Sequence, residues 1–134
     1  MADINKAGAV IIKDRQLLVS RSKGKDIFVA PGGKLEEGED DLMALARELR
    51  EEQSVEIDPD STELLGEFKA IAAGDNQERS IRMGVYIVNR YEGNLTPSSE
   101  IEENAWVNSQ TTLPLGSIFE HDVIPALVKR NLID

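Results

Sequence analysis

The chain has 134 residues, of which 40% are hydrophobic and 30% charged, and a formal net charge of −10. This length and balance are typical of a globular protein, so we expect residues 1–134 to form a single domain around one hydrophobic core. The sequence contains no cysteine, which excludes disulfides and thiolate metal sites. The acidic surplus repels polyanions and argues against a nucleic-acid polymer as partner.

The sequence predicts neither a membrane span nor a signal peptide. No apolar run approaches the roughly 18–20 residues that cross a bilayer, and the opening residues MADINK lack the charged-then-apolar layout of a secretory signal. We therefore expect no membrane partner. A reducing cytoplasm is the simplest location for a chain without cysteine.

The first half of the chain predicts two strands followed by a helix. Segments 7–13 and 16–22 are rich in β-branched and apolar residues and flank a short polar turn, which indicates strands. Pro31-Gly32-Gly33 then interrupts regular structure. Residues 40–53 carry apolar side chains at three- and four-residue steps behind two aspartates, a pattern that predicts a helix.

A long hairpin and a polar loop are predicted next. Extended runs at 63–73 and 80–90 flank a polar turn at 74–79. Residues 91–103 are polar and contain glycine and proline, so we expect them to form a loop.

The end of the chain predicts a short strand at 105–107 and a last helix over 118–131. Pro125 either kinks this helix or moves its start to a later residue. Strands that alternate with helices predict an α/β/α sandwich with a mixed central sheet.

Three glutamates of the predicted helix share one face. Glu48, Glu51 and Glu52 stand at positions i, i+3 and i+4. At about 100° per residue, all three project into one sector beside the apolar stripe. Like charges at this spacing repel, and the repulsion grows at the edge of a core.

Two interpretations of this acidic face are open from the residues alone. Glu–Arg pairs at helical spacing need no metal, so the face can be a solvated surface in which Arg47 and Arg50 offset the charge. The other interpretation is a divalent cation such as Mg²⁺, which prefers oxygen ligands and leaves positions for water and substrate phosphates. Such a cation would lower the pKa of an attacking water and neutralise phosphate charge.

The surrounding pattern favours the metal. Residues 33–55, GKLEEGEDDLMALARELREEQSV, resemble the Nudix box, which runs from a glycine through a glutamate to an Arg-Glu-apolar-any-Glu-Glu core. Gly33, Glu39 and Arg47 stand at the required spacing, and Val55 closes the box. The late glycine of the box is replaced by Ser54, which puts a tight turn in doubt, because a positive φ costs serine roughly 1 kcal/mol.

The resemblance implies roles for individual residues. Carboxylates of the box would bind Mg²⁺, with Mn²⁺ as a substitute, and the carbonyl of the first glycine would add a ligand, while Glu39 and Arg47 would brace the loop and helix. A fourth carboxylate usually comes from outside the box, before an apolar-aromatic strand, and Glu100 is our choice, ahead of Glu103. The implied catalytic residues are Glu48, Glu51, Glu52, Glu100 and Arg47, and the implied metal ligands are Glu48, Glu51, Glu52, Gly33 and Glu100.

Basic residues are candidates for holding substrate phosphates. Arg21 and Lys23 stand at the end of the second predicted strand, and Lys34 follows the glycine pair. Local positive charge on an acidic protein favours anion binding. Solvated surface charge is the alternative for each of them.

The resemblance implies hydrolysis of a phosphoanhydride bond in a nucleoside diphosphate-linked small molecule. Accessory motifs of NADH, coenzyme A, ADP-ribose and dinucleoside polyphosphate members are missing, so we favour the MutT-like group. Its substrate would be a nucleoside triphosphate, including oxidised or noncanonical ones, cleaved to monophosphate and pyrophosphate.

The alternatives to this substrate are ADP-ribose, a nucleotide sugar or a dinucleoside polyphosphate. An alternative of another class is a noncatalytic Nudix domain that senses a nucleotide. Dimers are common in this family and among symmetric assemblies, so a homodimer is compatible with the resemblance and the oligomeric state stays open.

Overall fold

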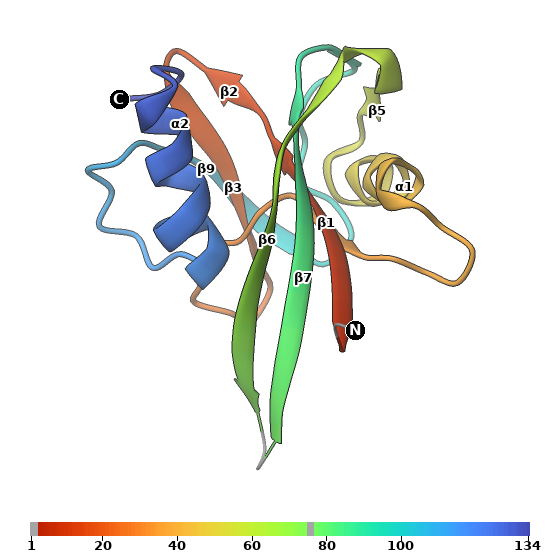
Figure 1. Ribbon diagram of the computed structural model, residues 1–134. Helices are drawn as coiled ribbons and strands as arrows, with labels where there is room; N and C mark the ends of the chain where they lie inside the picture. Colours follow the sequence, from red (N-terminus) through yellow and green to blue (C-terminus); the bar gives the residue numbers. More distant parts are fainter. Residues whose placement is uncertain (1–2, 75–76) are drawn as a thin grey trace.

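The computed structural model describes residues 3–74 and 77–134. Its helices are α1 (Asp41–Gln53) and α2 (Ile124–Lys129), and its strands are β1 (Ile4–Val10), β2 (Ile12–Lys13), β3 (Gln16–Ser22), β4 (Gly32–Lys34), β5 (Glu56–Ile57), β6 (Thr62–Gly74), β7 (Gln77–Val88), β8 (Tyr91–Glu92) and β9 (Ile101–Val107). Helices α1 and α2 lie on opposite sides of the strands, and the β6–β7 hairpin extends beyond the body (Figure 1).

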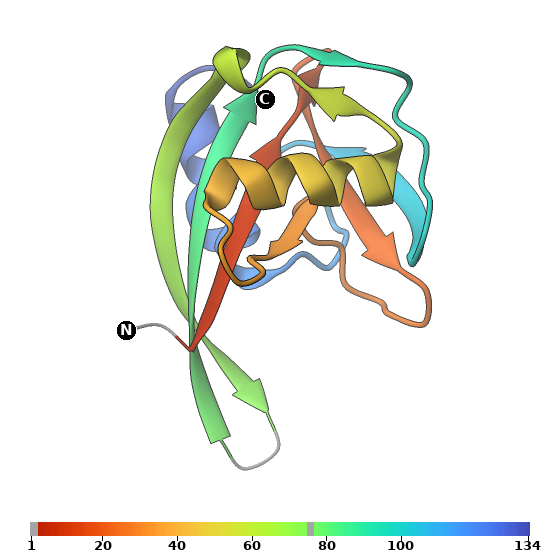
Figure 2. The same ribbon diagram turned by 90° about the vertical axis from the view of Figure 1, so that its right-hand side faces the viewer.

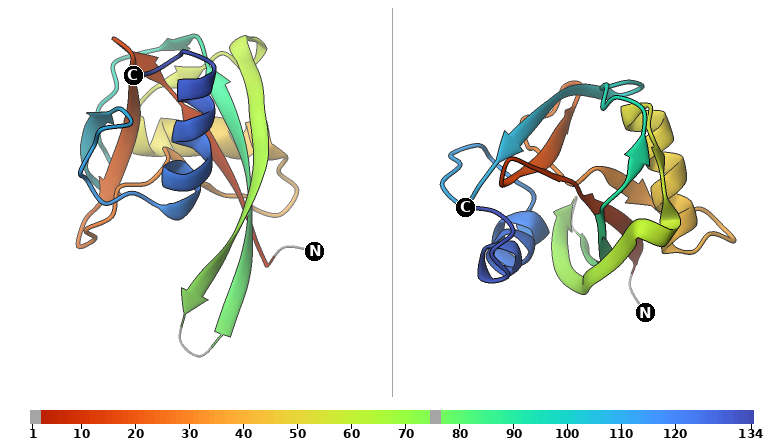
Figure 3. Two further views of the ribbon diagram at one scale, coloured as in Figure 1. Left: turned by 60° about the vertical axis from the view of Figure 1, so that its left-hand side comes forward. Right: turned by 90° about the horizontal axis from the view of Figure 1, so that it is seen from above.

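The central sheet has the strand order β4-β1-β7-β6. Strands β1 and β7 are parallel, whereas β1–β4 and β6–β7 are antiparallel, so the predicted mixed sheet between helices is confirmed. A second sheet has the order β2-β3-β9, and β5 pairs with β8. Seen from above, the two helices flank the strands on either side (Figure 3). Within the described residues, no helix has the length and apolar character that a membrane span requires.

Helix α1 begins where its sequence predicts. The Asp40 side chain accepts a hydrogen bond from the Met43 backbone N–H at 2.9 Å, which caps the helix. Leu45 and Leu49 on its inner face are fully buried against small residues of β1 such as Ala7 and Ala9. This helix crosses the sheet in Figure 2. The small β1 side chains let the helix approach the strand closely.

An ion pair fixes the start of α1 on the sheet. Arg82 of β7 donates two hydrogen bonds to the Asp41 carboxylate, at 2.7 and 2.8 Å, and the Tyr86 hydroxyl donates a third at 2.7 Å. The hydrogen bonds from Arg82 lower the pKa of Asp41. Gly84 lies beneath this group, where any side chain would collide with the Asp41 carboxylate. The orientation of α1 over the sheet is therefore set at its N-terminus.

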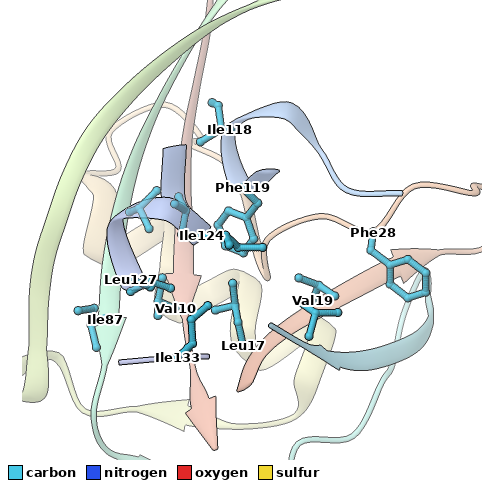
Figure 4. Packing of buried hydrophobic residues seen from close by; sticks show 13 residues of the cluster. Val10, Leu17, Val19, Phe28, Ile87, Ile118, Phe119, Ile124, Leu127 and Ile133 are labelled. Carbon is cyan, nitrogen blue, oxygen red and sulfur yellow. The ribbon is translucent and has the colours of Figure 1, made fainter. Parts of the chain in front are cut away.

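The opposite face of the sheet packs under α2. Val10, Leu17 and Val19 contribute buried side chains from the strands, and Phe119 and Leu127 contribute them from the C-terminal helical segment. The close-up in Figure 4 shows these side chains converging between α2 and the strands. Burial of apolar surface on both faces is the main driving force for this arrangement, at about 25 cal/mol per Å².

Two segments differ from the sequence-based prediction. The loop expected at 91–103 is wrong in part, because β9 already begins at Ile101. The Ile101 side chain is buried, and the polar residues that follow it face solvent on the outer strand of the second sheet. The helix expected over 118–131 is instead a π-helical turn at Phe119–Val123 followed by α2. Pro125 lacks the N–H that an α-helical turn requires at this point, which accounts for the wider turn.

The expected strands are otherwise present with shifted ends. The first predicted strand is divided into β1 and β2, and the polar turn expected at 74–79 is shorter, because β6 reaches Gly74 and β7 starts at Gln77. Residues 75–76 of that turn lie outside the described residues.

Helix α1 ends in a left-handed residue. Ser54 has φ 60° and ψ 31°, and its backbone N–H donates to the Arg50 carbonyl at 3.2 Å. This is the position where the Nudix box has glycine, and the positive φ anticipated from the sequence is present. A left-handed conformation strains any residue with a β-carbon.

We predict that Ser54→Gly stabilises the protein by about 1 kcal/mol, because glycine removes this strain. The Ser54 hydroxyl makes only a 3.4 Å contact with the Ser98 hydroxyl, so little is lost. Urea unfolding monitored by circular dichroism measures the change. Ser54→Ala is the matched control, since it removes the same hydroxyl but keeps the strain. Equal stability of the two variants would contradict the explanation.

Candidate metal centre

The three glutamates of α1 lie side by side but differ in exposure. The Glu51 side chain is 54% exposed and that of Glu48 is 16% exposed, whereas Glu52 is buried, with 7% of its surface exposed. Helical geometry therefore places one carboxylate in solvent, one at the edge of the core and one inside it. The predicted common face exists, and it extends from the surface into the protein.

Glu52 is the most strongly perturbed of these carboxylates. One of its oxygens accepts a hydrogen bond from the Gly32 backbone N–H at 3.0 Å. The pKa of Glu52 is raised to about 8, chiefly by burial; the hydrogen bond from Gly32 opposes this rise, and the negative charges of Glu48, Glu100 and Glu51 contribute to it. Among the residues that the structure describes, no cationic side chain pairs with Glu52 to stabilise its ionised form.

The glycine pair of β4 forms the wall opposite α1. A β-carbon on Gly33 would stand 2.7 Å from the Glu48 carboxyl carbon and 2.9 Å from each of its oxygens, so only glycine leaves room for that carboxylate. Gly32 has φ +133°, and a β-carbon there would collide with the Ala7 carbonyl. The two glycines let the β4 backbone approach the glutamates of α1 directly.

Arg47 holds the acidic residues in place. Its guanidinium donates two hydrogen bonds to Glu39, both at 2.9 Å, and one to Glu48 at 2.8 Å. A further hydrogen bond runs to the Lys34 carbonyl at 3.1 Å. Because a guanidinium is planar, these contacts fix both side chains and the β4 backbone at once. The predicted bracing of loop and helix by Glu39 and Arg47 is thus visible in the structure.

The pKa values of Glu39 and Glu48 are shifted in opposite directions. The hydrogen bonds from Arg47 lower the pKa of Glu39 to about 2. Burial raises the pKa of Glu48, although Arg47 opposes this and the charges of Glu51 and Glu100 add to it. Arg47 is therefore shared between Glu39 and Glu48, and it compensates the α1 cluster only in part.

Glu100 joins the cluster from outside the helix. The loop that carries Glu100 donates hydrogen bonds to free backbone carbonyls at the end of α1. The Ser98 N–H donates to the Glu52 carbonyl at 2.9 Å, and the Thr96 N–H donates to the Gln53 carbonyl at 3.0 Å. The Ser98 hydroxyl donates to the Glu51 carbonyl at 2.6 Å. The charge of Glu100 acts on both Glu48 and Glu52. The structure therefore brings Glu100 to the α1 cluster.

The other candidate outside the helix points elsewhere. Glu103 lies on β9 opposite Arg21 of β3, and the two side chains form an ion pair at 2.9 Å. Arg21 also donates to the Lys25 carbonyl at 2.9 Å, and its guanidinium lies 6.0 Å from the centre of the Phe28 ring. Arg21 is thus engaged by the protein itself.

The remaining basic candidates lie on two sides of the cluster. The Lys23 backbone N–H donates to the Glu100 carbonyl at 2.8 Å, which places the end of β3 beside the Glu100 loop. Lys34 is exposed on β4, directly after Gly33, and stands opposite Lys6 of β1. The structure does not gather Arg21, Lys23 and Lys34 into one patch.

A buried polar network at the end of α1 is absent from the sequence-based prediction. The Gln53 amide N–H₂ donates to the Ser20 hydroxyl at 2.9 Å and to Asn104 Oδ1 at 2.8 Å, and the Asn104 amide donates back at 2.7 Å. Gln53 and Ser20 are almost completely buried. The available signal was helical spacing, because Gln53 continues the stripe of Leu45 and Leu49 at four-residue steps.

The donor chemistry of this cluster fits a hard divalent cation. Glu48, Glu51 and Glu52 project from one face of α1, and the charge of Glu100 acts on Glu48 and Glu52; two of these carboxylates are shielded from solvent, and the adjacent Gly33 leaves the backbone accessible. Within residues 3–74 and 77–134, no three acidic or histidine side chains already converge as a preformed ligand cage. Glu48 faces Arg47 and Glu52 faces Gly32, so both would turn toward a cation that displaced these hydrogen bonds.

Comparison with known proteins points to one family. The model of the NUDIX domain matches residues 4–127. A search of curated proteins found no match.

Several solved structures share the fold. The solution structure of the E. coli ORF135 protein is 24% identical, with a TM-score of 0.77 over 96% of this chain and 90% of that chain. A MutT NUDIX hydrolase from Burkholderia pseudomallei is 23% identical, with a TM-score of 0.75 over 93% and 95% of the two chains. A UDP-X diphosphatase is 15% identical, with a TM-score of 0.71 over 98% of this chain and 64% of that one. At these identities the likeness is one of fold.

We predict that Glu52→Gln stabilises the metal-free protein at alkaline pH. The folded-state pKa of about 8 lies above the usual value, so the stability associated with Glu52 is fully present at low pH and is lost as the pH rises through about 8. Glutamine stays neutral at every pH, so the variant does not lose this stability. The variant should exceed the parent by on the order of 2 kcal/mol at pH 9, with little difference near pH 4.

Unfolding in EDTA across this pH range measures the effect. Glu51→Gln is the matched control, because its side chain is exposed. A Glu52→Gln difference that is independent of pH would show that this carboxylate is not the titrating group.

Proposed function

The chain belongs to the Nudix family, whose members are pyrophosphohydrolases, and we propose from this premise that it cleaves nucleoside triphosphates to monophosphate and pyrophosphate. Nudix hydrolases generally use divalent metal ions. The ion that we propose here is Mg²⁺, with Mn²⁺ as a substitute. When bound, it would supply neutralisation of phosphate charge and a lowered pKa for the attacking water.

The observation that carries this proposal is the carboxylate cluster at the glycine pair. Within the described part of the chain, Glu52 is buried and forms no ion pair, Glu48 shares Arg47 with Glu39, and Glu100 adds its charge to both Glu48 and Glu52. A fold that served only as scaffold would gain stability from apolar or neutral residues at these positions. We therefore assign Glu48, Glu51, Glu52 and Glu100 as cation ligands, with the Gly33 carbonyl as a further oxygen donor.

The remaining residues would position these ligands and the substrate. Arg47 sets the direction of Glu48 and ties it to the backbone of β4. Glu100, on a loop rather than on the helix, would act either as a ligand or as the base that takes a proton from the attacking water. Lys34 and Lys23, on opposite sides of the cluster, would contact phosphate oxygens, and Arg21 would do so only after releasing Glu103.

Among substrates of this chemistry, the absence of the accessory motifs of other Nudix groups supports a triphosphate. The fold alone does not distinguish the candidates, since it is shared by proteins described as MutT and by a UDP-X diphosphatase. The noncatalytic alternative is disfavoured because a sensor has little need for a complete set of carboxylates. The lack of cysteine supports the proposed cytoplasmic location.

We predict that the purified protein releases pyrophosphate and a nucleoside monophosphate from nucleoside triphosphates when Mg²⁺ or Mn²⁺ is present. A panel of triphosphates, ADP-ribose, nucleotide sugars and dinucleoside polyphosphates, analysed by ion-exchange chromatography, measures this. Two monophosphates from ADP-ribose or a nucleotide sugar, or a nucleoside monophosphate and a nucleoside di- or triphosphate from a dinucleoside polyphosphate, with triphosphates left intact, would replace the proposed substrate. Tight nucleotide binding without any turnover would favour the sensor.

Glu52→Gln should lower metal-dependent turnover by more than about a hundredfold while the circular dichroism spectrum stays unchanged, because an essential anionic ligand is lost. Glu102→Gln is the control, since this exposed carboxylate lies on β9 close to the Glu100 loop but outside the cluster. Calorimetric titration with Mg²⁺ or Mn²⁺, with and without nucleotide, should show uptake by the parent protein and weaker uptake by Glu52→Gln. Parent-like rates in that variant would remove Glu52 from the mechanism.

A further inference from the structure

An apolar pocket adjoins the carboxylate cluster on the α2 side of the sheet. It encloses about 150 Å³, and Gly32 and Gly33 form the part of its wall that faces the cluster. The rest of the lining is mostly apolar and includes Val29, Met83 and Phe119. An apolar cavity of about this volume is known to hold a single aromatic ring, so this half-open pocket accommodates one ring of a base and leaves the rest at its mouth.

One charged side chain lines this pocket. Lys6 is half-buried on β1, and the alternation of strand residues places it on the same face as Val10, which packs in the α2-side core. Burial lowers the pKa of Lys6. The positive charge of Lys34, its direct partner across the β1–β4 pair, repels the Lys6 ammonium and lowers this pKa further. Within residues 3–74 and 77–134, no carboxylate forms an ion pair with Lys6. Its amine therefore lacks a partner that would make its burial favourable.

An ammonium group in an apolar pocket selects for a particular ligand. A lysine side chain offers three hydrogen-bond donors and no acceptor. The apolar lining favours a flat heterocycle over a phosphate, since burial of a multiply charged anion is costly. The matching ligand is thus a ring with a carbonyl oxygen on its edge.

We propose that Lys6 is a specificity-determining residue that selects nucleotides whose base carries a carbonyl oxygen where adenine and cytosine carry an amino group. This inference rests on the proposed function, which places the phosphates at the carboxylate cluster, and it adds that the base enters the adjoining pocket past Gly32 and Gly33. Guanine and hypoxanthine present an acceptor at the purine edge, and thymine and uracil present one at the pyrimidine edge, whereas adenine and cytosine present a donor there. A donor facing the Lys6 ammonium leaves both groups unsatisfied.

Lys6 would thereby disfavour the adenine nucleotides. A site that rejects the adenine ring disfavours ATP, and with it ADP-ribose and other adenine-containing coenzymes, whatever their leaving group. The base pocket thus narrows the substrate class independently of the phosphate chemistry.

The test compares two nucleotides that differ in this edge group and in the protonation of the adjacent ring nitrogen. Inosine triphosphate and ATP are assayed by steady-state kinetics with Mg²⁺, and their binding is measured by calorimetry in metal-free buffer. For the parent protein, kcat/KM and affinity should favour inosine triphosphate by about 10- to 100-fold, the usual effect of a charged hydrogen bond. Uridine and cytidine triphosphates form a second pair and should show the same order.

Lys6→Met is the variant to test, since it keeps an unbranched side chain of similar length but removes the donors. Its preference should fall to within about threefold, mainly because inosine triphosphate loses affinity. Lys6→Arg, which keeps donors, should retain a preference. Lys13→Met on β2 is the matched control and should behave as the parent, because Lys13 is exposed and lies outside the pocket.

Two results would overturn the assignment. Equal affinity and kcat/KM of the parent for inosine triphosphate and ATP would exclude selection at this edge, and turnover of both would leave the proposed function intact. An equal loss on all four nucleotides in Lys6→Met would show that Lys6 serves the phosphates. A parent that prefers inosine triphosphate in binding but hydrolyses neither nucleotide would support the base selection and contradict the proposed function.

Discussion

The close approach of helix α1 to the glycine pair of β4 is the constraint on which the site depends. Gly33 leaves space for the Glu48 carboxylate, and the Gly32 N–H reaches inward to Glu52. A side chain at Gly33 would push the helix and the strand apart, so the carboxylates would regain water, and one at Gly32 would collide with the Ala7 carbonyl of β1. Their perturbed pKa values are thus a consequence of backbone packing, because burial is the largest contribution for both Glu48 and Glu52.

Both ends of α1 are fixed by polar contacts, which keeps the helix in this position. Asp41 is held by Arg82 and Tyr86 at the first turn. At the last turn, the Gln53 side chain is held inside the core, and the carbonyls of the final residues receive hydrogen bonds from the loop that carries Glu100. The same contacts that satisfy the helix terminus bring the fourth carboxylate to the cluster. The hydrogen bonds that cap the C-terminal end of α1 therefore also position Glu100.

Local patterns in the sequence were sufficient to predict most of the fold and the centre of the candidate site. The helix start at Asp40 and the shared face of the glutamates follow from residue spacing, whereas the positive φ of Ser54 was anticipated only from the resemblance to the Nudix box, which has glycine at this position. The early start of β9 could not be predicted in this way, because it depends on pairing with the distant strand β3, whereas the π-helical turn stands just before Pro125, where the sequence already indicates an irregular helix. The burial of Glu52 could not be predicted either, since helical spacing gives the direction of its side chain but not the proximity of Gly32.

The two buried carboxylates of α1 are compensated unequally. Arg47 donates to Glu48 but is also committed to Glu39, and its hydrogen bonds draw the pKa of Glu39 down to about 2 while the pKa of Glu48 stays raised. Among the described residues, the hydrogen-bond partner of the Glu52 carboxylate is a backbone N–H. When Glu52 ionises, above a pKa of about 8, its negative charge is therefore uncompensated at the innermost position, where low dielectric makes it most costly. A cation that binds the folded state offsets this cost and so stabilises the fold, by the linkage between binding and stability. The charge that destabilises the metal-free protein is the same charge that gives such a cation its affinity.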